Sequence, residues 1–515
     1  MPFFNFSRNN FLKGGQGFSA ARMLRQFKNW ITSHGSPDGE VIADLPTLRA
    51  RARDLHKNNS LARAAEETLV RNVIGPGLKM QTAVDYDAIA KELNISAEEA
   101  EVIANKFEHD IEALWYDYYN SKLCDARGVS DGPSLTRLMF SSVLQSGDVF
   151  ATFPRHDGLP RLGLIEADQV QNPLGRFSNM HLRDGVLVSD SGVPVGYMVN
   201  SNQEQWPERN QFIPKYGTES GRALILHLFR EERPGQNRGI PWVAPVIEQL
   251  KNLDGYEKSE ITGQLVSSFL TFFAERTVPS GKLLPGGGLE EDPQLGADFN
   301  AGPAAILEVP YGIKMTAHNP ARANSNTVGF IESVIKKIGA ALGVPFEILI
   351  AHYTTSFTSA RAARIEFWKT VTMWRDWLTV NAMNPWYHEF LTDAIISGKV
   401  QAPGFFTNEN LRRAWSGANW YGPALGQINE KVEAEAIQTV VMSGGKSATA
   451  AFAEAYGTDY EDTMRQIKRE KAFRQRLGLT LSIDERPANA APLPAATPPE
   501  GQDEIPDTPT TDEPA

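Results

Sequence analysis

Two long amphipathic stretches, separated by a Gly- and Pro-rich stretch, constrain the fold of this chain most. Over residues 245–274, apolar residues recur at helical spacing and charged residues occupy the opposite side. At 1.5 Å per residue such a helix would be about 45 Å long. Residues 324–342 repeat the pattern, with an apolar face made of Val328, Ile331, Val334, Ile335, Ile338 and Leu342. The sequence therefore predicts two long helices that bracket a loop-rich module at residues 279–320. The polar faces of these helices must meet water, a partner or another copy of the chain.

The rest of the 515-residue chain contains both helical and strand-like segments. Helical spacing covers residues 45–73, 95–119, a stretch that begins after Ser134, residues 360–397 and residues 426–478. Shorter strand-like pieces separated by Gly, Pro and Asn fill residues 148–229. The predicted fold class is α+β, predominantly helical. Six tryptophans between Trp368 and Trp420 are expected to pack in the core rather than to stack on bases.

The composition is that of an ordinary soluble protein, and the hydrophobic content of 41% is sufficient for a large core. Cys124 is the only cysteine, which excludes an internal disulfide and a cysteine-rich zinc site and favours a reducing compartment. The N-terminal residues do not resemble a secretory signal, and the longest apolar stretches are too short to cross a membrane. We therefore expect a soluble, intracellular protein without a membrane partner.

The negative charge of the chain is concentrated at its C-terminal end. The formal net charge is −11, but residues 482–515 hold eight acidic residues and one arginine. This Pro-rich, acidic tail, residues 481–515, is expected to be disordered. The remaining body is nearly neutral, which argues against a strongly basic nucleic-acid clamp. A protein past which DNA must slide is still compatible with this charge.

No catalytic motif is complete. Gly444-Gly445-Lys446-Ser447 suggests a phosphate loop, but Val440 stands where that loop needs its first glycine. A helix that ends at a glycine, followed by a helix capped by Ser447, explains this stretch better. The G-x-G-x-x-A pattern from Gly15 has no preceding strand, and the acidic run from Glu290 lies in a Gly/Pro-rich loop. The chain has no HExxH and no GxSxG motif, so we expect no enzyme activity, no cofactor and no metal site.

Many short stretches, in one order along the chain, resemble the lambda-type phage portal protein family. They begin with Arg51-Ala52-Arg53-Asp54-Leu55 and continue with VRNVIGPGLKMQ (from Val70), CDARG (Cys124), SGDVFATFPR (Ser146), IEADQV (Ile165), GVPVGYMV (Gly192), HLFREERPGQNRGIPWVAPVI (His227), IGAALGVPFEIL (Ile338), FTSARAARIEFW (Phe357) and the stretch from Gly444 to Leu479. The resemblance covers roughly residues 45–478. It leaves out the basic arm and the acidic tail, and residues 279–320 carry no family signature.

The resemblance implies a dodecameric ring at one capsid vertex, through which a separate terminase motor drives double-stranded DNA. Each subunit would have a mixed α/β wing, a two-helix stem, a loop-rich clip and a helical crown. The implied parts are a basic N-terminal arm (1–44), the wing (45–244), stem helix 1 (245–277), the clip (278–321), stem helix 2 (322–345), a tunnel loop region (346–360), wing helices (361–425), the crown (426–480) and the tail (481–515). The implied partners are double-stranded DNA, the terminase large subunit, major capsid and scaffold proteins, and head-completion or tail proteins. The implied locations are the virion and, during assembly, the host cytoplasm.

The channel lining should adhere only weakly to DNA, because each lysine contact adds salt-sensitive affinity. The expected lining residues are Glu332, Lys336, Lys337, His352, Tyr353, Thr354, Thr355 and Ser356. Glu332 and Lys336 are four residues apart on one helix and partly neutralise each other. Alternatively, the two lysines pair with neighbouring stem helices. Two other functions stay open here: a DNA-packaging enzyme of the terminase ATPase or nuclease kind, and a monomeric DNA-binding adaptor.

Overall fold

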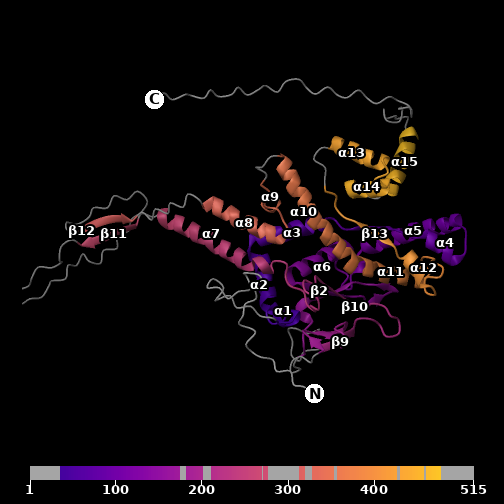
Figure 1. Ribbon diagram of the computed structural model, residues 1–515, viewed down its shortest axis with the longest axis horizontal. Coiled ribbons are helices and arrows are strands. Elements are labelled where there is room, and N and C mark those ends of the chain that lie inside the picture. Colours follow the sequence, from indigo (N-terminus) through magenta and orange to yellow (C-terminus); the bar gives the residue numbers. More distant parts are fainter. Residues whose placement is uncertain are drawn as a thin grey trace, which may run out of the picture.

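The chain forms a mostly helical body from which a pair of helices projects (Figure 1). The structure, a computed structural model, describes residues 35–173, 181–200, 210–268, 271–276, 313–318, 327–352, 357–425, 430–457 and 460–476. Several predictions fall outside these residues: most of the basic arm and the clip, the acidic run from Glu290, the channel candidates at 353–356 and the acidic tail.

Helices make up most of the body, as predicted. They are α1 (Pro37–Val41), α2 (Leu45–Asn58), α3 (Ser60–Val73), α4 (Tyr86–Leu93), α5 (Ala97–Tyr119), α6 (Gly132–Ser146), α9 (Phe346–Leu349), α10 (Phe357–Leu378), α11 (Asn384–Ile396) and α12 (Glu409–Trp415). The break between α2 and α3 has a local cause, because Asn59 leaves the helical conformation and its side chain accepts a hydrogen bond from the Ala62 N–H at 2.9 Å. Helix α6 begins at Gly132, earlier than the sequence suggested, because Asp131 caps it.

Two small antiparallel sheets form the β part of the body, within the strand-like region of the sequence. One has the order β10-β2-β5 and the other the order β6-β7-β8-β9. Their strands are β2 (Asp148–Thr152), β5 (Gly163–Glu166), β6 (Leu182–Arg183), β7 (Val186–Val188), β8 (Pro194–Asn200), β9 (Asn210–Pro214) and β10 (Ile225–Phe229). Two further pairs are β1 (Lys79–Thr82) with β13 (Ala418–Tyr421), and β3 (Arg155–His156) with β4 (Leu159–Pro160). The predicted α+β class is confirmed.

Aromatic residues fill the core between α5 and α11. Trp115 lies within 6 Å, centroid to centroid, of Trp386, Tyr387 and Phe390. Trp386 is fully buried, and so is Trp415, which packs on Phe107 at 4.7 Å. The expectation of aromatic core packing is therefore confirmed for the buried tryptophans of this region, and their faces are not available to bases.

A buried ion cluster joins α2 to both sheets. We call it the Asp148 cluster; it consists of Arg49, Arg53, Asp148, Asp168, Asp184, His227 and Arg238. Asp148 and Arg238 have fully buried side chains, and the Arg238 Nε donates to Asp148 Oδ2 at 2.6 Å. Arg49 Nη2 donates to the other carboxylate oxygen at 2.9 Å. The cluster thus holds α2 against β2, and α2 in turn contacts the first turns of the projecting helix α7.

The charges of the Asp148 cluster depend on one another. Burial alone would raise the pKa of Asp148, but Arg238 and Arg49 outweigh it and hold that pKa far below its usual range. Burial lowers the pKa of His227, so this histidine is neutral at pH 7 although it lies 3.3 Å from Asp148. Its ring stacks on Phe150 at 4.2 Å. The carboxylate of Asp148 is therefore compensated by the two arginines.

A second group of charges fastens the strand region to α11. Arg222 and Arg155 both contact Glu389 and Asp393, whose side chains are 9% and 6% exposed. The end of the predicted basic arm is also part of the body, because Asp38 in α1 accepts hydrogen bonds from the main chain and side chain of Asn237 at 2.8 Å. These contacts give the projecting helices a rigid base.

The last described helices are α13 (Glu430–Met442), α14 (Ala448–Tyr456) and α15 (Tyr460–Arg476), in the stretch that the resemblance assigns to a crown, and we use that name for these three helices. Gly444 follows α13 with a φ of 73°, in the left-handed region that favours glycine. The side chain of Ser447 then caps α14 by accepting from the Ala450 N–H at 3.2 Å. The predicted helix-turn-helix reading of the Gly-Gly-Lys-Ser stretch is confirmed, and Lys446 forms an ion pair with Glu454 instead of cradling a phosphate.

Candidate functional site

The projecting pair consists of α7 (Ile247–Ser268) and α8 (Thr327–Leu342), which lie side by side (Figure 1). At the far end of the pair, β11 (Thr271–Arg276) and β12 (Ile313–His318) form an antiparallel hairpin. The predicted first helix was therefore too long, because residues 271–276 are a strand. Thr271, Phe272 and Phe273 favour a strand, and pairing with β12 supplies the hydrogen bonds that a helix would have made.

Among the side chains of the pair that the structure describes, those nearest the body are the most buried. Leu250 and Leu253 of α7, and Ile338 and Leu342 of α8, belong to the main hydrophobic core. Farther from the body, Ile261 is 61% exposed, Val328 71% and Phe330 50%. Val328, at one end of the predicted apolar face of α8, is thus exposed in the single chain. Three exposed apolar side chains near one another on a projecting helix pair make a candidate surface for contact with another copy.

The helical positions separate the exposed side chains of α8 by direction. With 3.6 residues per turn, Glu332 and Lys336 lie on the side opposite the stripe that contains Ile338. Phe330 and Lys337, seven residues apart, share one flank of the helix, and Val328 lies on the other flank. Each flank therefore carries an exposed apolar residue, whereas the ridge between the flanks is polar.

The predicted channel residues of α8 are accessible. Glu332 Oε2 and Lys336 Nζ are 3.3 Å apart, and their side chains are 45% and 56% exposed. Lys336 Nζ also lies 4.9 Å from the centroid of the Phe346 ring in α9. Lys337 and His352 are exposed. The structure thus brings Glu332 and Lys336 together, whereas Lys337 lies on the flank of α8 next to them. Tyr353, Thr354, Thr355 and Ser356 are outside the described residues.

The sequence analysis did not identify Ile261 and Phe330 as candidate contact residues. Phe330 could have been identified, since it is a large apolar residue that lies outside the apolar stripe of its own helix. Ile261 could not, because it was counted within the stripe of the first helix. It lies about two turns beyond Leu253, which is still buried in the core of the body.

Two kinds of site are missing from the part of the chain that the structure describes. Over those residues, no three His, Cys, Asp or Glu side chains gather in a way that could hold a metal ion. None of the described helices has the length and apolar character needed to span a membrane.

Comparisons with known proteins agree with the resemblance. Residues 24–375 match the family described as phage portal protein, lambda family. The chain is 24% identical over 495 residues to portal protein B of Escherichia phage lambda, covering 90% of each chain. It is also 24% identical over 494 residues to the portal protein of Escherichia phage N15, again covering 90% of each.

A similar solved structure is a chain from the neck of an empty GTA particle, with 14% identity and a TM-score of 0.46, covering 84% of this chain and 94% of that one. Because the family match alone extends over more than half of the sequence, from before α1 to the end of α10, this chain belongs to the lambda family of phage portal proteins.

Proposed function

We propose that copies of this portal protein close into a ring, twelve to a ring, and that double-stranded DNA passes through its centre at one vertex of the capsid. As a portal protein the chain is a structural component of the virion and not an enzyme, so the terminase-like alternative is excluded. The observation that carries the proposal is the projecting pair with exposed Ile261, Val328 and Phe330. Side-by-side packing of such pairs would bury these side chains between neighbours.

The two flanks of α8 suit a closed ring. In a cyclic assembly each subunit contacts one neighbour through one surface and the next neighbour through a different surface. Val328 and Phe330 point to different sides of α8, and Phe330 remains half exposed although its ring lies 5.2 Å, centroid to centroid, from that of Tyr256 in α7. The remaining ridge, with Glu332 and Lys336, then faces neither neighbour, and we assign it to the channel.

Replacing Phe330 by glutamate is expected to prevent ring formation without unfolding the subunit. Burying a phenylalanine contributes about 1.5–3 kcal/mol, and a buried unpaired carboxylate costs more than that contribution. Size-exclusion chromatography with light scattering should therefore show monomers or small oligomers, while the circular dichroism spectrum keeps the helical signal of the wild type. Val102→Glu is a matched control, because Val102 is 69% exposed on α5 of the body. A wild-type chain that stays monomeric would favour a DNA-binding adaptor and contradict the ring.

Replacing Lys336 and replacing Lys337 are expected to have different effects, the first on the amount of DNA retained and the second on ring formation. Lys336 on the polar ridge would form a ring of weak cationic contacts with the DNA backbone, whereas Lys337 shares its flank with Phe330. We expect Lys336→Ala particles to retain less DNA, because the remaining lining holds the duplex less well. Lys337→Ala should instead weaken the ring.

The measurement is the length of the packaged genome on a pulsed-field gel, with the exposed Lys369→Ala in α10 as control. Full-length genomes in correctly formed Lys336→Ala rings would count against a channel position for this side chain.

We also propose the partners that a portal ring requires. The terminase large subunit, the capsid and scaffold proteins, and head-completion or tail proteins would contact it during assembly in the host cytoplasm. The support is membership of the portal family, and no described surface is assigned to any of these partners.

A further inference from the structure

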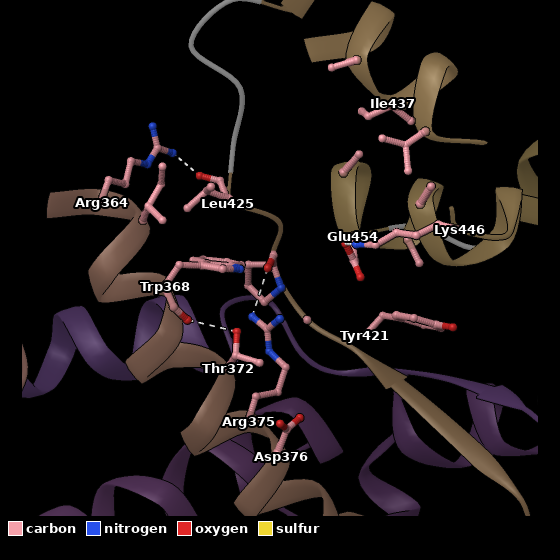
Figure 2. A pocket seen from close by; sticks show the side chains of 18 of the residues that line it. Arg364, Trp368, Thr372, Arg375, Asp376, Tyr421, Leu425, Ile437, Lys446 and Glu454 are labelled. Atoms are coloured by element: carbon pink, nitrogen blue, oxygen red, sulfur yellow. Dashed lines mark hydrogen bonds and ion pairs between the residues drawn. The ribbon is translucent and has the colours of Figure 1, made fainter. Parts of the chain in front are cut away.

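A cavity of about 790 Å³ separates the crown from the wing. Helix α10 forms one wall, helices α13 and α14 form the other, and the segment after β13 lies between them. Figure 2 shows Arg364, Trp368 and Arg375 on the α10 side, with Lys446 and Glu454 of the crown across from them. The cavity is large enough to hold a short peptide segment.

The cavity carries uncompensated positive charge. Its lining holds Arg361, Arg364, Arg375 and Lys446 but only two acidic residues, Asp376 and Glu454. Glu454 is already paired with Lys446 at 2.5 Å. Among the residues that the structure describes, Arg361 and Arg364 form no ion pair, and Arg364 donates to the Leu425 carbonyl oxygen. An anionic occupant would therefore find free cationic partners here.

Arg375 is largely buried, and its hydrogen bonds go to main-chain oxygens. It donates to the carbonyl oxygens of Val73, Asn72 and Pro423 at 2.9–3.1 Å. Burial lowers the pKa of Arg375 to about 10, so the guanidinium is still charged at neutral pH. A carboxylate near it would relieve the cost of burying this charge.

The cavity also presents aromatic surface. Trp368 is half-buried, and the Arg375 guanidinium lies 5.3 Å from the centroid of its ring. Tyr421 and Ile437 line the opposite side. Flat aromatic rings next to polar groups are the surfaces on which proline-rich segments dock in extended conformation.

We propose that residues 500–513 of the same chain, its acidic and proline-rich C-terminal segment, occupy this cavity and tie the crown to α10. The segment contains six carboxylates, no lysine or arginine, and Pro506 and Pro509 between the acids. Its carboxylates can form ion pairs with the free arginines, and its prolines can pack on the rings of Trp368 and Tyr421. The inference concerns one subunit and does not depend on ring formation.

The chain between α15 and the proposed segment is long enough to let the segment reach the cavity. Helix α15 ends at Arg476, and 23 residues separate it from Glu500. An extended chain of that length spans about 75 Å. Helix α15, about 25 Å long, contacts α14, which lines the cavity. The segment can therefore reach the cavity of its own subunit.

The test places a thiol in the segment of the full-length chain. Thr508→Cys is labelled with a small fluorophore that tryptophan quenches on contact. The one native cysteine, Cys124, is buried, and burial raises the pKa of its thiol to about 12, so it stays unlabelled at neutral pH. We expect quenched emission that recovers several-fold with Trp368→Phe, with Arg361→Glu and in about 0.5 M salt.

Arg412→Glu is the matched control, since it makes the same charge change at an exposed arginine of α12. Recovery with Arg361→Glu but not with Arg412→Glu supports the proposal. Equal emission in all variants, or equal recovery with both charge reversals, overturns it. Recovered emission when the labelled chain is mixed with excess unlabelled Trp368→Phe chain under subunit exchange would place the segment in a neighbouring subunit and overturn the same-chain assignment.

Discussion

Replacing Asp148 by asparagine is expected to lower the free energy of unfolding by about 3–5 kcal/mol, because it removes the fully buried carboxylate that Arg49 and Arg238 share and leaves them only the partly exposed Asp168 and Asp184. Asparagine has nearly the same shape, so the loss comes from charge and not from a cavity. Arg238 is fully buried and Arg49 nearly so. Urea unfolding of the purified chain, followed by circular dichroism, measures the change. Asp168→Asn is the control: this residue pairs with Arg49 and Arg53 but is 38% exposed, and its loss should cost about 1 kcal/mol or less.

The effect of Asp148→Asn should depend on pH in a defined direction. The pKa of Asp148 in the folded chain lies well below the unfolded value of about 3.9. The stabilisation by this carboxylate is therefore fully present above about pH 4 and is lost progressively as the pH falls further. The difference between the wild type and the variant should stay the same from pH 7 to about pH 4 and shrink from there to pH 3. A difference that is constant over this range would show that the ion pairs are not its cause.

Local patterns were sufficient to predict most of the elements. The apolar spacing of residues 45–73 and 95–119 predicted α2, α3 and α5, and short alternating pieces predicted strands such as β8 and β10. The failures have local causes as well. Residues 271–276 have a strand-forming composition, and their partner, β12, lies about 40 residues away, beyond what helical spacing can detect.

The Asp148 cluster could not be predicted, because its members come from distant parts of the chain. The stretches SGDVFATFPR, IEADQV and HLFREERPGQNRGIPWVAPVI each showed the family resemblance, and they contribute Asp148, Asp168, and His227 with Arg238. The sequence showed these stretches only as separate matches. In the structure they meet around one carboxylate, close to the base of the projecting pair.

The candidate site was predictable as a helix pair but not in its surface. Amphipathic spacing identified α8 and its polar ridge with Glu332 and Lys336. It could not show where the body ends along the pair, and this decides that Val328 and Phe330 are exposed. The exposure of a side chain in one subunit depends on tertiary packing. The spacing of apolar residues along one helix does not distinguish contacts within a subunit from contacts between copies.

Gly239→Ala is expected to lower the free energy of unfolding by at least about 3 kcal/mol. A Cβ at this position would overlap the carbonyl oxygen of Gly147 and lie 2.5 Å from its carbonyl carbon, and neither backbone can yield as a flexible side chain would. Gly147 precedes Asp148 and Gly239 follows Arg238, so the added methyl group would push apart the two residues that make the central ion pair. Both backbones are close because neither residue carries a side chain.

Two comparisons separate this cause from a general effect of the added methyl group. Gly255→Ala in α7 has no heavy atom within 4 Å and should raise stability by up to about 1 kcal/mol, since alanine favours the helix. The double variant Asp148→Asn with Gly239→Ala should lose clearly less than the sum of the single losses, because both changes disrupt the same contact. If urea unfolding shows strictly additive losses, the close approach of Gly147 and Gly239 does not act through the Asp148 cluster, and the two features stabilise the base of the projecting helices independently.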